Sequence, residues 1–349
     1  MERPRAGLLT GMRAVVYTET GPSSVLRVVD RDLPEPGPGE VRVRLVRAGV
    51  NPTDWKFRAG MMSGHDEVTP GQDGAGVVDA VGEGVVDHAV GDRVWLVLAQ
   101  HGRPYGTAAE HTVQPADRVT RLPGAASYDL GASVGVPAVT AHRALTTIEG
   151  GPARLGPGAL EGRTVHVAGG AGAVGNAAIQ LARWAGATVV ATVSSDEKAA
   201  LARAAGADHV VNYREEDAAG AVLAIAPDGV DLAVEVAPAQ NVGLDLEVVR
   251  VHGTVAVYAN NGGDELTMPL RAAFGKNLRF QFIILYTLHE QLRRAAVEDV
   301  AAALEAGALR VGEDAGVPLH HYPLEETAAA HDAVEGGAVG KVLLDIADA

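Results

Sequence analysis

A glycine-rich stretch, Gly170-Ala-Gly172-Ala-Val-Gly175, lies directly between a predicted strand and a predicted helix. Small residues at such a turn let the backbone approach a pyrophosphate, and the free N–H groups at the helix N-terminus bind its charge. Ala173 and Val174 belong to the same N-terminus. The alternative is an ordinary glycine-rich turn, but the strand–turn–helix context favours a dinucleotide site.

The next predicted strand ends in "ATVVATVSSDEK", where an NAD-binding protein usually has a carboxylate for the adenosine ribose. Here Ser194 and Ser195 stand at that end, and Lys198 follows one helical turn later. Hydroxyls donate to phosphate oxygens and an ammonium supplies positive charge, so we expect a 2′-phosphate and hence NADPH. Tyr213, after the following strand, is expected to close the pocket. In the alternative, Asp196 binds the ribose of NAD and Ser194 caps the helix.

Composition excludes several classes of function. The net charge of −15 disfavours nucleic acid and anionic membranes, which bind basic faces. The chain has no cysteine, and its 12 histidines are scattered, so we predict no metal site. No apolar run is long enough to span a bilayer, and we expect a cytoplasmic protein. Residues 1–11 resemble a loose leader before Met12.

The elements that position these residues change in character along the chain. The first 135 residues have short Val-rich strands divided by Gly, which favours a barrel or sandwich, whereas strands then alternate with helices, which favours a parallel sheet. We therefore predict an α/β protein with a β-rich domain over 1–136, which the resemblance described below implies to be catalytic, and a Rossmann domain over 137–287. The tail, 288–349, has no sheet of its own and is expected to complete the first domain.

Several stretches together resemble the medium-chain dehydrogenase/reductase superfamily, and within it the zinc-independent, zeta-crystallin-like quinone oxidoreductases. They are "AGVNPTDWKFRAG", "PGQDGAGVVDAVGEGV", "VGDRVW", "GTAAEHTVQPADRVTRLP", "VTAHRAL", the glycine turn and "GKVLLDI". The resemblance implies a GroES-like barrel, a doubly wound Rossmann sheet and a homodimer. The apolar stretch "NLRFQFIILY" is expected to be the last strand of the sheet and its dimer edge.

The resemblance also implies positions near the cofactor. Thr140 matches a position on the nicotinamide side, and Lys341 matches another near the cofactor. Val236 and Ala237 follow a predicted Rossmann strand and should approach the nicotinamide ribose. The zinc-ligand positions of the related alcohol dehydrogenases match Asn51 and Gln72 here, and neither residue is a good zinc ligand.

Three residues are candidates for the chemistry itself. Asn51 is expected to make a polar contact with cofactor or substrate, although Asn-Pro is also a natural turn. Lys56 is a candidate for stabilising negative charge on the product, although a solvated surface position suits it equally. Tyr258 ends a predicted strand at the edge where such sheets bind ligands. We expect loops 64–68 and 99–105 to line the substrate cleft.

Without zinc, the acceptor should be one that takes hydride readily and carries the charge on a distant oxygen. We therefore expect an NADPH-dependent reductase of a small neutral quinone or carbonyl compound, most simply a quinone. One alternative is an enone, alkenal or enoyl-thioester reductase on the same scaffold. Another, of a different class, is a non-catalytic NADPH-binding protein with a structural or regulatory role.

Overall fold

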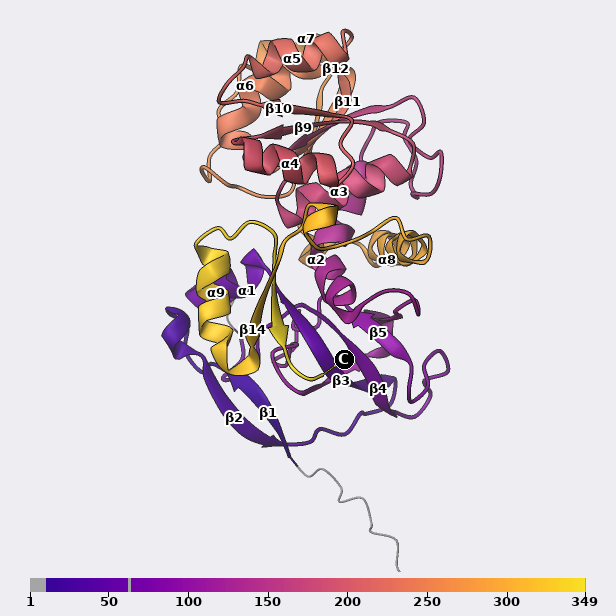
Figure 1. The fold of residues 1–349 in the computed structure, drawn as a ribbon, viewed down its shortest axis with the longest axis vertical. Helices are drawn as coiled ribbons and strands as arrows, with labels where there is room; N and C mark the ends of the chain where they lie inside the picture. Colours follow the sequence, from indigo (N-terminus) through magenta and orange to yellow (C-terminus); the bar gives the residue numbers. More distant parts are fainter. Residues whose placement is uncertain (1–10, 62–63, 349) are drawn as a thin grey trace, which may run out of the picture. The chain divides into compact units, whose positions relative to one another are not determined.

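The computed structural model describes residues 11–61 and 64–348, so nearly all of the expected leader lies outside the described residues. The chain divides into two compact units (Figure 1). The first comprises residues up to 135 with 320–338 and 342–349, and the second comprises 136–319 with 339–341. The boundary falls within α2 (Tyr128–Leu145), a helix that continues through Pro137.

The first unit is built on a seven-stranded sheet around β3 (Glu40–Val50). One side of β3 pairs antiparallel with β4 (Asp73–Val81), and the other pairs with β6 (His111–Pro115) and β15 (Lys341–Asp345). Its apolar residues Val41, Val43 and Leu45 are fully buried in the core. The unit also contains β1 (Gly11–Val16), β2 (Arg27–Asp32), α1 (Pro52–Lys56), β5 (Arg93–Leu96), β7 (Val119–Arg121), β14 (Leu319–Pro323) and α9 (Thr327–Glu335).

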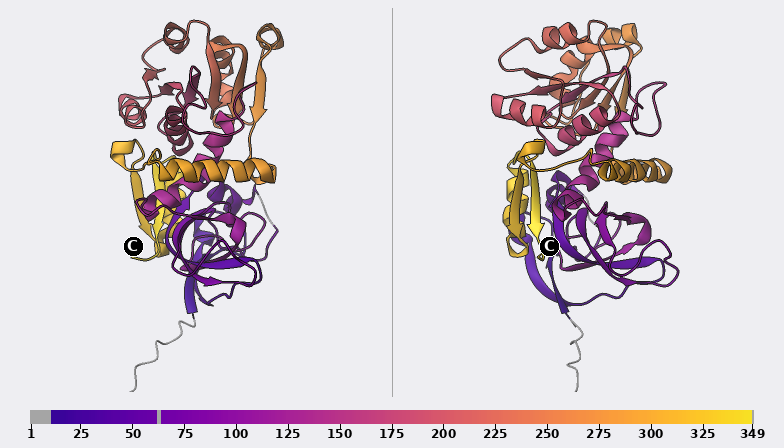
Figure 2. Two further views of the ribbon diagram at one scale, coloured as in Figure 1. Left: turned by 90° about the vertical axis from the view of Figure 1, so that its right-hand side faces the viewer. Right: turned by 45° about the vertical axis from the view of Figure 1, so that its right-hand side comes forward.

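The carboxyl-terminal strands join the first unit, as the sequence predicts, but from a later residue. In Figure 2 the yellow C-terminal strands lie beside indigo strands from the other end of the chain, and Val342 pairs with Val50. We expected this completion to begin at residue 288. Instead residues 288–319, which include α8 (Glu290–Glu305), belong to the second unit.

The second unit contains a six-stranded parallel sheet in the order β10-β9-β8-β11-β12-β13. This is the Rossmann order, so the predicted α/β fold with a doubly wound sheet is confirmed. Helices α3 and α4 cover one face and α5 and α6 the other (Figure 1). The elements are β8 (Thr164–Ala168), α3 (Ala173–Trp184), β9 (Thr188–Val193), α4 (Asp196–Ala204), β10 (His209–Asn212), α5 (Ala218–Ile225), β11 (Val230–Glu235), α6 (Pro238–Val248), β12 (Val249–Val257), α7 (Leu270–Lys276) and β13 (Arg279–Phe282).

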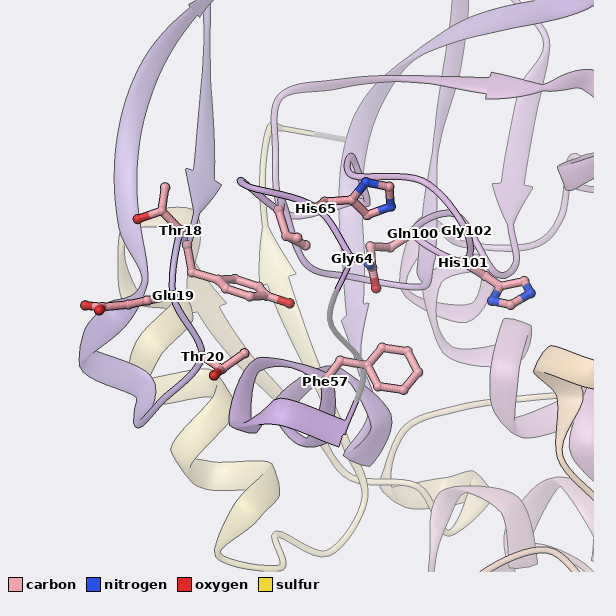
Figure 3. A pocket seen from close by; sticks show the side chains of 11 residues that line it. Thr18, Glu19, Thr20, Phe57, Gly64, His65, Gln100, His101 and Gly102 are labelled. Atoms are coloured by element: carbon pink, nitrogen blue, oxygen red, sulfur yellow. The ribbon is translucent and has the colours of Figure 1, made fainter.

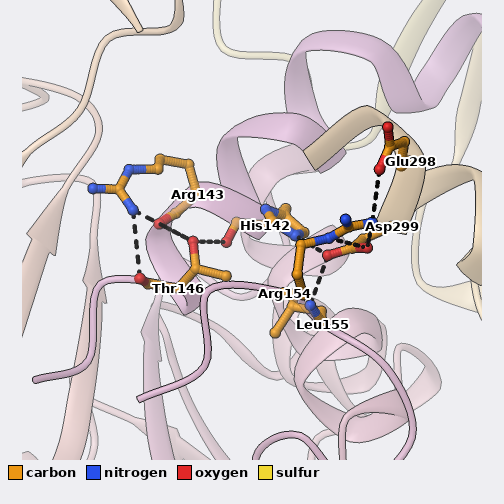
Figure 4. Close-up of polar contacts among 7 residues, drawn as sticks. All are labelled: His142, Arg143, Thr146, Arg154, Leu155, Glu298 and Asp299. Carbon is orange, nitrogen blue, oxygen red and sulfur yellow. Dashed lines mark hydrogen bonds and ion pairs between the residues drawn. The ribbon is translucent and has the colours of Figure 1, made fainter. Parts of the chain in front are cut away.

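Polar contacts to Asp299 explain why α8 belongs with the second unit (Figure 4). Asp299 is buried, and its carboxylate lies 2.7 Å from Nε2 of His142 on α2. It also accepts hydrogen bonds from the guanidinium of Arg154 and from the backbone N–H of Leu155. A carboxylate satisfied on three sides by one unit ties its helix to that unit. The hydrophobic periodicity of the sequence alone does not predict which unit α8 packs against.

The predicted last strand is confirmed as β13, at the edge of the parallel sheet. Its neighbourhood exposes large apolar side chains: Phe282 is 60% exposed and Ile284 is 56% exposed. Phe274, on α7, is 70% exposed. An apolar sheet edge of this kind is unusual on a monomer and favours a covering partner.

Candidate functional site

The carboxyl ends of the parallel strands bring most of the predicted cofactor residues to one edge of the second unit. The glycine turn follows β8, Ser194 follows β9 and Tyr213 follows β10. Val236 follows β11, and Tyr258 follows β12, its N–H donating to the carbonyl of Glu235. Ligands of open α/β sheets bind at this edge, so the structure places these residues where a dinucleotide would be held.

Gly175 is the residue of the glycine turn that tolerates no side chain. A Cβ there would lie 2.4 Å from the carbonyl oxygen of Gly169 and 3.1 Å from Cα of Gly170. Gly170 is also constrained, because its Cβ would lie 2.9 Å from Cβ of Ala191. These contacts let α3 start against the end of β8. Gly169 has a φ of +68° and was not identified from the sequence, since the predicted motif begins one residue later.

The first turn of α3 presents the backbone donors that an anion needs. Gly172 is its N-cap, and the first helical bond runs from the N–H of Asn176 to the carbonyl of Gly172. The N–H groups of Ala173, Val174 and Gly175 precede that bond, so the helix itself leaves them without acceptors. Gly172 is exposed and Ala173 and Val174 are half-buried, which leaves this end of the helix accessible. The chain therefore fits a pyrophosphate here.

The two serines after β9 have different roles. The Oγ of Ser195 accepts a hydrogen bond from the N–H of Lys198 and so caps α4. The Oγ of Ser194 instead lies 3.1 Å from Nζ of Lys198. We expected both hydroxyls to bind phosphate and, in the alternative, Ser194 to be the cap; in the structure the cap is Ser195. A hydroxyl and an ammonium thus stand together at the position of the usual ribose-binding carboxylate.

Tyr213 and Asp196 bear on the choice between the two cofactors. The N–H of Tyr213 donates to the carbonyl of Val193, so Tyr213, directly after β10, lies beside the end of β9, and it is 51% exposed. Asp196 lies in the exposed first turn of α4. The group at the end of β9 that reaches Ser194 is therefore the ammonium of Lys198 and not a carboxylate.

The loop after β11 is held by a fully buried pair of carboxyl groups that the sequence did not reveal. Glu235 accepts hydrogen bonds from the N–H of Ala237 and from the amide of Asn241 at 3.0 Å. Burial raises the pKa of Glu235, and burial together with the charge of Glu235 raises the pKa of Asp245 well above its usual range. Two buried carboxyls so placed are stable when they share a proton. Burial also raises the pKa of Tyr258, so its phenol stays neutral.

Asn51 has two hydrogen-bond partners within the first unit. Its side-chain amide donates to Asp73 at 2.7 Å, and its N–H donates to Asp54 as the N-cap of α1. The buried amide of Gln72 donates to Gln100 at 2.9 Å. Among the described residues no three His, Asp or Glu side chains gather as a metal site would require. The expectation of a metal-free protein stays a prediction.

The surroundings of three other predicted residues do not identify a ligand. Lys56 is half-buried, with its Nζ 5.8 Å from the ring centre of Trp55. Thr140 is buried on α2, and Lys341 is buried with its N–H bonded to the carbonyl of Pro318. No contact of these residues identifies a ligand, and their roles stay predictions.

The first unit contains a cavity of about 310 Å³ that the two predicted cleft loops share (Figure 3). His65 comes from one loop, Gln100 and His101 come from the other, and the ring of Phe57 adds an apolar wall. The remaining lining residues are Tyr17, Thr18, Glu19, Thr20, Gly64, Val68 and Gly102. Asn51 and Lys56 are absent from this lining. The cavity is small and mixed in polarity, and no lysine or arginine lines it in the part of the chain that the structure describes, which suits a small neutral molecule.

Comparisons with known proteins agree with this architecture. Residues 37–124 match the model of the alcohol dehydrogenase GroES-like domain, and residues 173–302 match the model of the zinc-binding dehydrogenase family. The predicted GroES-like first domain is thereby confirmed. In the described part of the chain, no helix has the length and apolar character that crossing a membrane requires.

Individual relatives are similar over almost the whole chain. A quinone oxidoreductase from Lama guanicoe is 32% identical over 95% of this chain and 97% of its own. A 2-haloacrylate reductase from a Burkholderia species is 29% identical over 95% of this chain and 98% of its own. A mycobacterial protein solved in complex with NADPH is 30% identical, covers 95% of this chain and 99% of its own, and superposes with a TM-score of 0.79.

Proposed function

Because the chain belongs to the quinone oxidoreductase family of the medium-chain dehydrogenase/reductase superfamily, and is thus an oxidoreductase, we propose that it reduces a small neutral quinone with NADPH. When bound, NADPH supplies a hydride, which carries two electrons. The observation that carries the proposal is the edge of the Rossmann sheet. There the first turn of α3 is suited to the pyrophosphate, and the pair Ser194–Lys198 is suited to a further phosphate.

The preference for NADPH rests on charge. A carboxylate at the end of β9 would repel a 2′-phosphate, whereas the ammonium of Lys198, held 3.1 Å from the hydroxyl of Ser194, attracts it. The similar mycobacterial protein was solved with NADPH, which supports the same cofactor here. Ala173, Val174 and Gly175 would hold the pyrophosphate through their N–H groups, and Val236 and Ala237 would lie along the nicotinamide ribose.

The preference for a neutral acceptor rests on the cavity of the first unit. Among the described residues, its lining contains one carboxylate, Glu19, and no lysine or arginine. A substrate that carries a carboxylate, as an acrylate does, would be repelled by Glu19. The flat ring of a quinone suits the wall formed by Phe57, and the polar side chains of Gln100 and His101 suit its oxygens.

The proposal is tested by following the absorbance of NADPH, and separately of NADH, with 1,4-benzoquinone and then with a 2-alkenal, all in EDTA. We expect NADPH-selective turnover of the quinone at a rate that EDTA leaves unchanged. Turnover of the alkenal without the quinone would move the function to double-bond reduction. Tight NADPH binding without turnover of any acceptor would indicate a non-catalytic role, and loss of activity in EDTA would overturn the prediction of a metal-free enzyme.

Replacing Lys198 with alanine is expected to raise the Michaelis constant for NADPH about 10- to 100-fold, the cost of one charge-assisted contact. NADH lacks the 2′-phosphate, so its Michaelis constant should hardly change. Arg203→Ala is the matched control, since it removes one exposed positive charge from the same helix away from the sheet edge. Equal effects of Lys198→Ala on both cofactors would show that Lys198 does not bind the 2′-phosphate.

We also propose that a second copy of the chain covers the exposed edge at β13. The apolar side chains of Phe282, Ile284 and Phe274 lie on or beside this edge strand, and pairing two such edges extends the sheet while it buries them. Sedimentation at micromolar concentration should give twice the chain mass. A monomer under those conditions would exclude this arrangement.

A further inference from the structure

Tyr17 lines the cavity of the first unit and is fixed in place by the backbone. It directly follows β1, is 6% exposed, and pairs with Val68 through two backbone hydrogen bonds of 2.9 Å. Val68 lines the same cavity. One antiparallel bridge thus sets the backbone positions of both residues at this point of the cavity wall.

The hydroxyl of Tyr17 has no hydrogen-bond partner within the part of the chain that the structure describes. Burial raises the pKa of Tyr17 to about 12, with the charge of Asp54 adding to the effect and that of Arg58 opposing it. The phenol therefore keeps its proton throughout the neutral range. The hydroxyl oxygen is not fully shielded by the protein, so it can donate a hydrogen bond to a ligand in the cavity.

Other polar groups of the cavity are less suited to this task. The amide of Gln100 donates to the carbonyl of Arg103, and its oxygen accepts from Gln72, so both ends are engaged. His65 is exposed and in contact with solvent. His101 is half-buried and already has a partner. Tyr17 combines a backbone held by the bridge to Val68, a side chain that lines the cavity, and an available O–H.

We propose that the hydroxyl of Tyr17 is the hydrogen-bond donor for the oxygen of the acceptor, an inference that rests on the proposed quinone reduction. The acceptor takes a hydride from NADPH and one proton from water, and becomes the hydroquinone while NADP⁺ leaves. Tyr17 stabilises the negative charge that develops on the oxygen but keeps its own proton, because its pKa lies above the roughly 10 of an ordinary phenol. Tyr17 is then a catalytic residue, whereas water supplies the proton.

The first test is Tyr17→Phe, which removes the hydroxyl and keeps the buried ring. We expect kcat/KM for 1,4-benzoquinone to fall about 100-fold, as for loss of one donor to a developing oxyanion, with the Kd for NADPH unchanged. Tyr322→Phe is the control, because Tyr322 packs on the core of the same unit outside the cavity lining. If the wild type turns over quinone and Tyr17→Phe has the same kcat/KM, the proposal is overturned.

A second readout does not depend on turnover. The carbonyl stretch of bound, ¹³C-labelled cyclohexanone is measured by infrared difference spectroscopy in the wild type, Tyr17→Phe and Tyr322→Phe. We expect a band at lower frequency in the wild type and Tyr322→Phe than in Tyr17→Phe. The same frequency in all three, or no bound ketone in the wild type, would overturn the role of Tyr17. A shifted band without quinone turnover would support the donor while it overturns the proposed reaction.

Discussion

Asp299→Ala is expected to lower the free energy of unfolding by about 3–5 kcal/mol, a large part of the stability of an ordinary domain. The substitution leaves the buried N–H of Leu155 and Nε2 of His142 without their acceptor. Arg154 loses its carboxylate contacts at the same time. Denaturation of the whole chain in urea, followed by circular dichroism, gives the change.

Glu298→Ala is the matched control for Asp299→Ala. Glu298 is the preceding residue of α8 and lies 3.0 Å from the same guanidinium of Arg154, but both side chains are about half exposed. A pair of this kind contributes about 0–1 kcal/mol. If both variants lost a similar free energy of unfolding, the buried contacts of Asp299 would stabilise the fold no more than an exposed ion pair does.

The same network predicts how stability depends on pH. Burial tends to raise the pKa of Asp299, but hydrogen bonds from Arg154, His142 and Leu155 outweigh it, so the pKa is lowered in the folded protein. A carboxyl with a lowered pKa stabilises the fold at neutral pH and loses that contribution as the pH falls below about 4, its unfolded value. The acid side of the stability curve should therefore be flatter in Asp299→Ala than in the wild type.

The sequence predicts the second unit better than the location of α8, for a physical reason. Alternating strands and helices with glycine turns predict a parallel sheet with right-handed crossovers, so the class of fold follows from the sequence. The helix 290–305 carries an apolar stripe that many surfaces would bury equally well. Among the residues that it buries, Asp299 binds His142 from a distant part of the chain. The hydrophobic periodicity of the sequence does not predict a contact between two side chains so far apart in the chain.

The candidate site divides in the same way. Main-chain features such as the glycine turn are recognisable, because only certain residues fit the backbone there. The roles of side chains are harder to recognise from the sequence. Ser194 and Ser195 are two adjacent serines, and only the geometry shows that Ser195 caps α4. Tyr17 follows an alternating strand, where an aromatic residue is typical of a core position, and its place on a cavity wall depends on contact with Val68.

Gly175→Ala is expected to weaken NADPH binding about 100-fold and to lower stability by about 1–3 kcal/mol. The added Cβ would lie 2.4 Å from the carbonyl oxygen of Gly169, which is backbone and cannot rotate away. Helix α3 must therefore move from the end of β8 and carry the N–H groups of its first turn with it. A displacement near 1 Å is enough to disrupt hydrogen bonds to a pyrophosphate.

Gly243→Ala separates this clash from the general effect of an alanine in a helix. Gly243 lies inside α6, where a Cβ would meet no atom within 4 Å, so alanine there should stabilise the helix slightly, by about 0.5–1 kcal/mol. The two substitutions add the same methyl group to helices of the same unit and should change stability in opposite directions. NADPH binding, measured by nicotinamide fluorescence, should be lost in Gly175→Ala alone. If Gly175→Ala bound NADPH as tightly as the wild type, the pyrophosphate would have to bind elsewhere than at the first turn of α3.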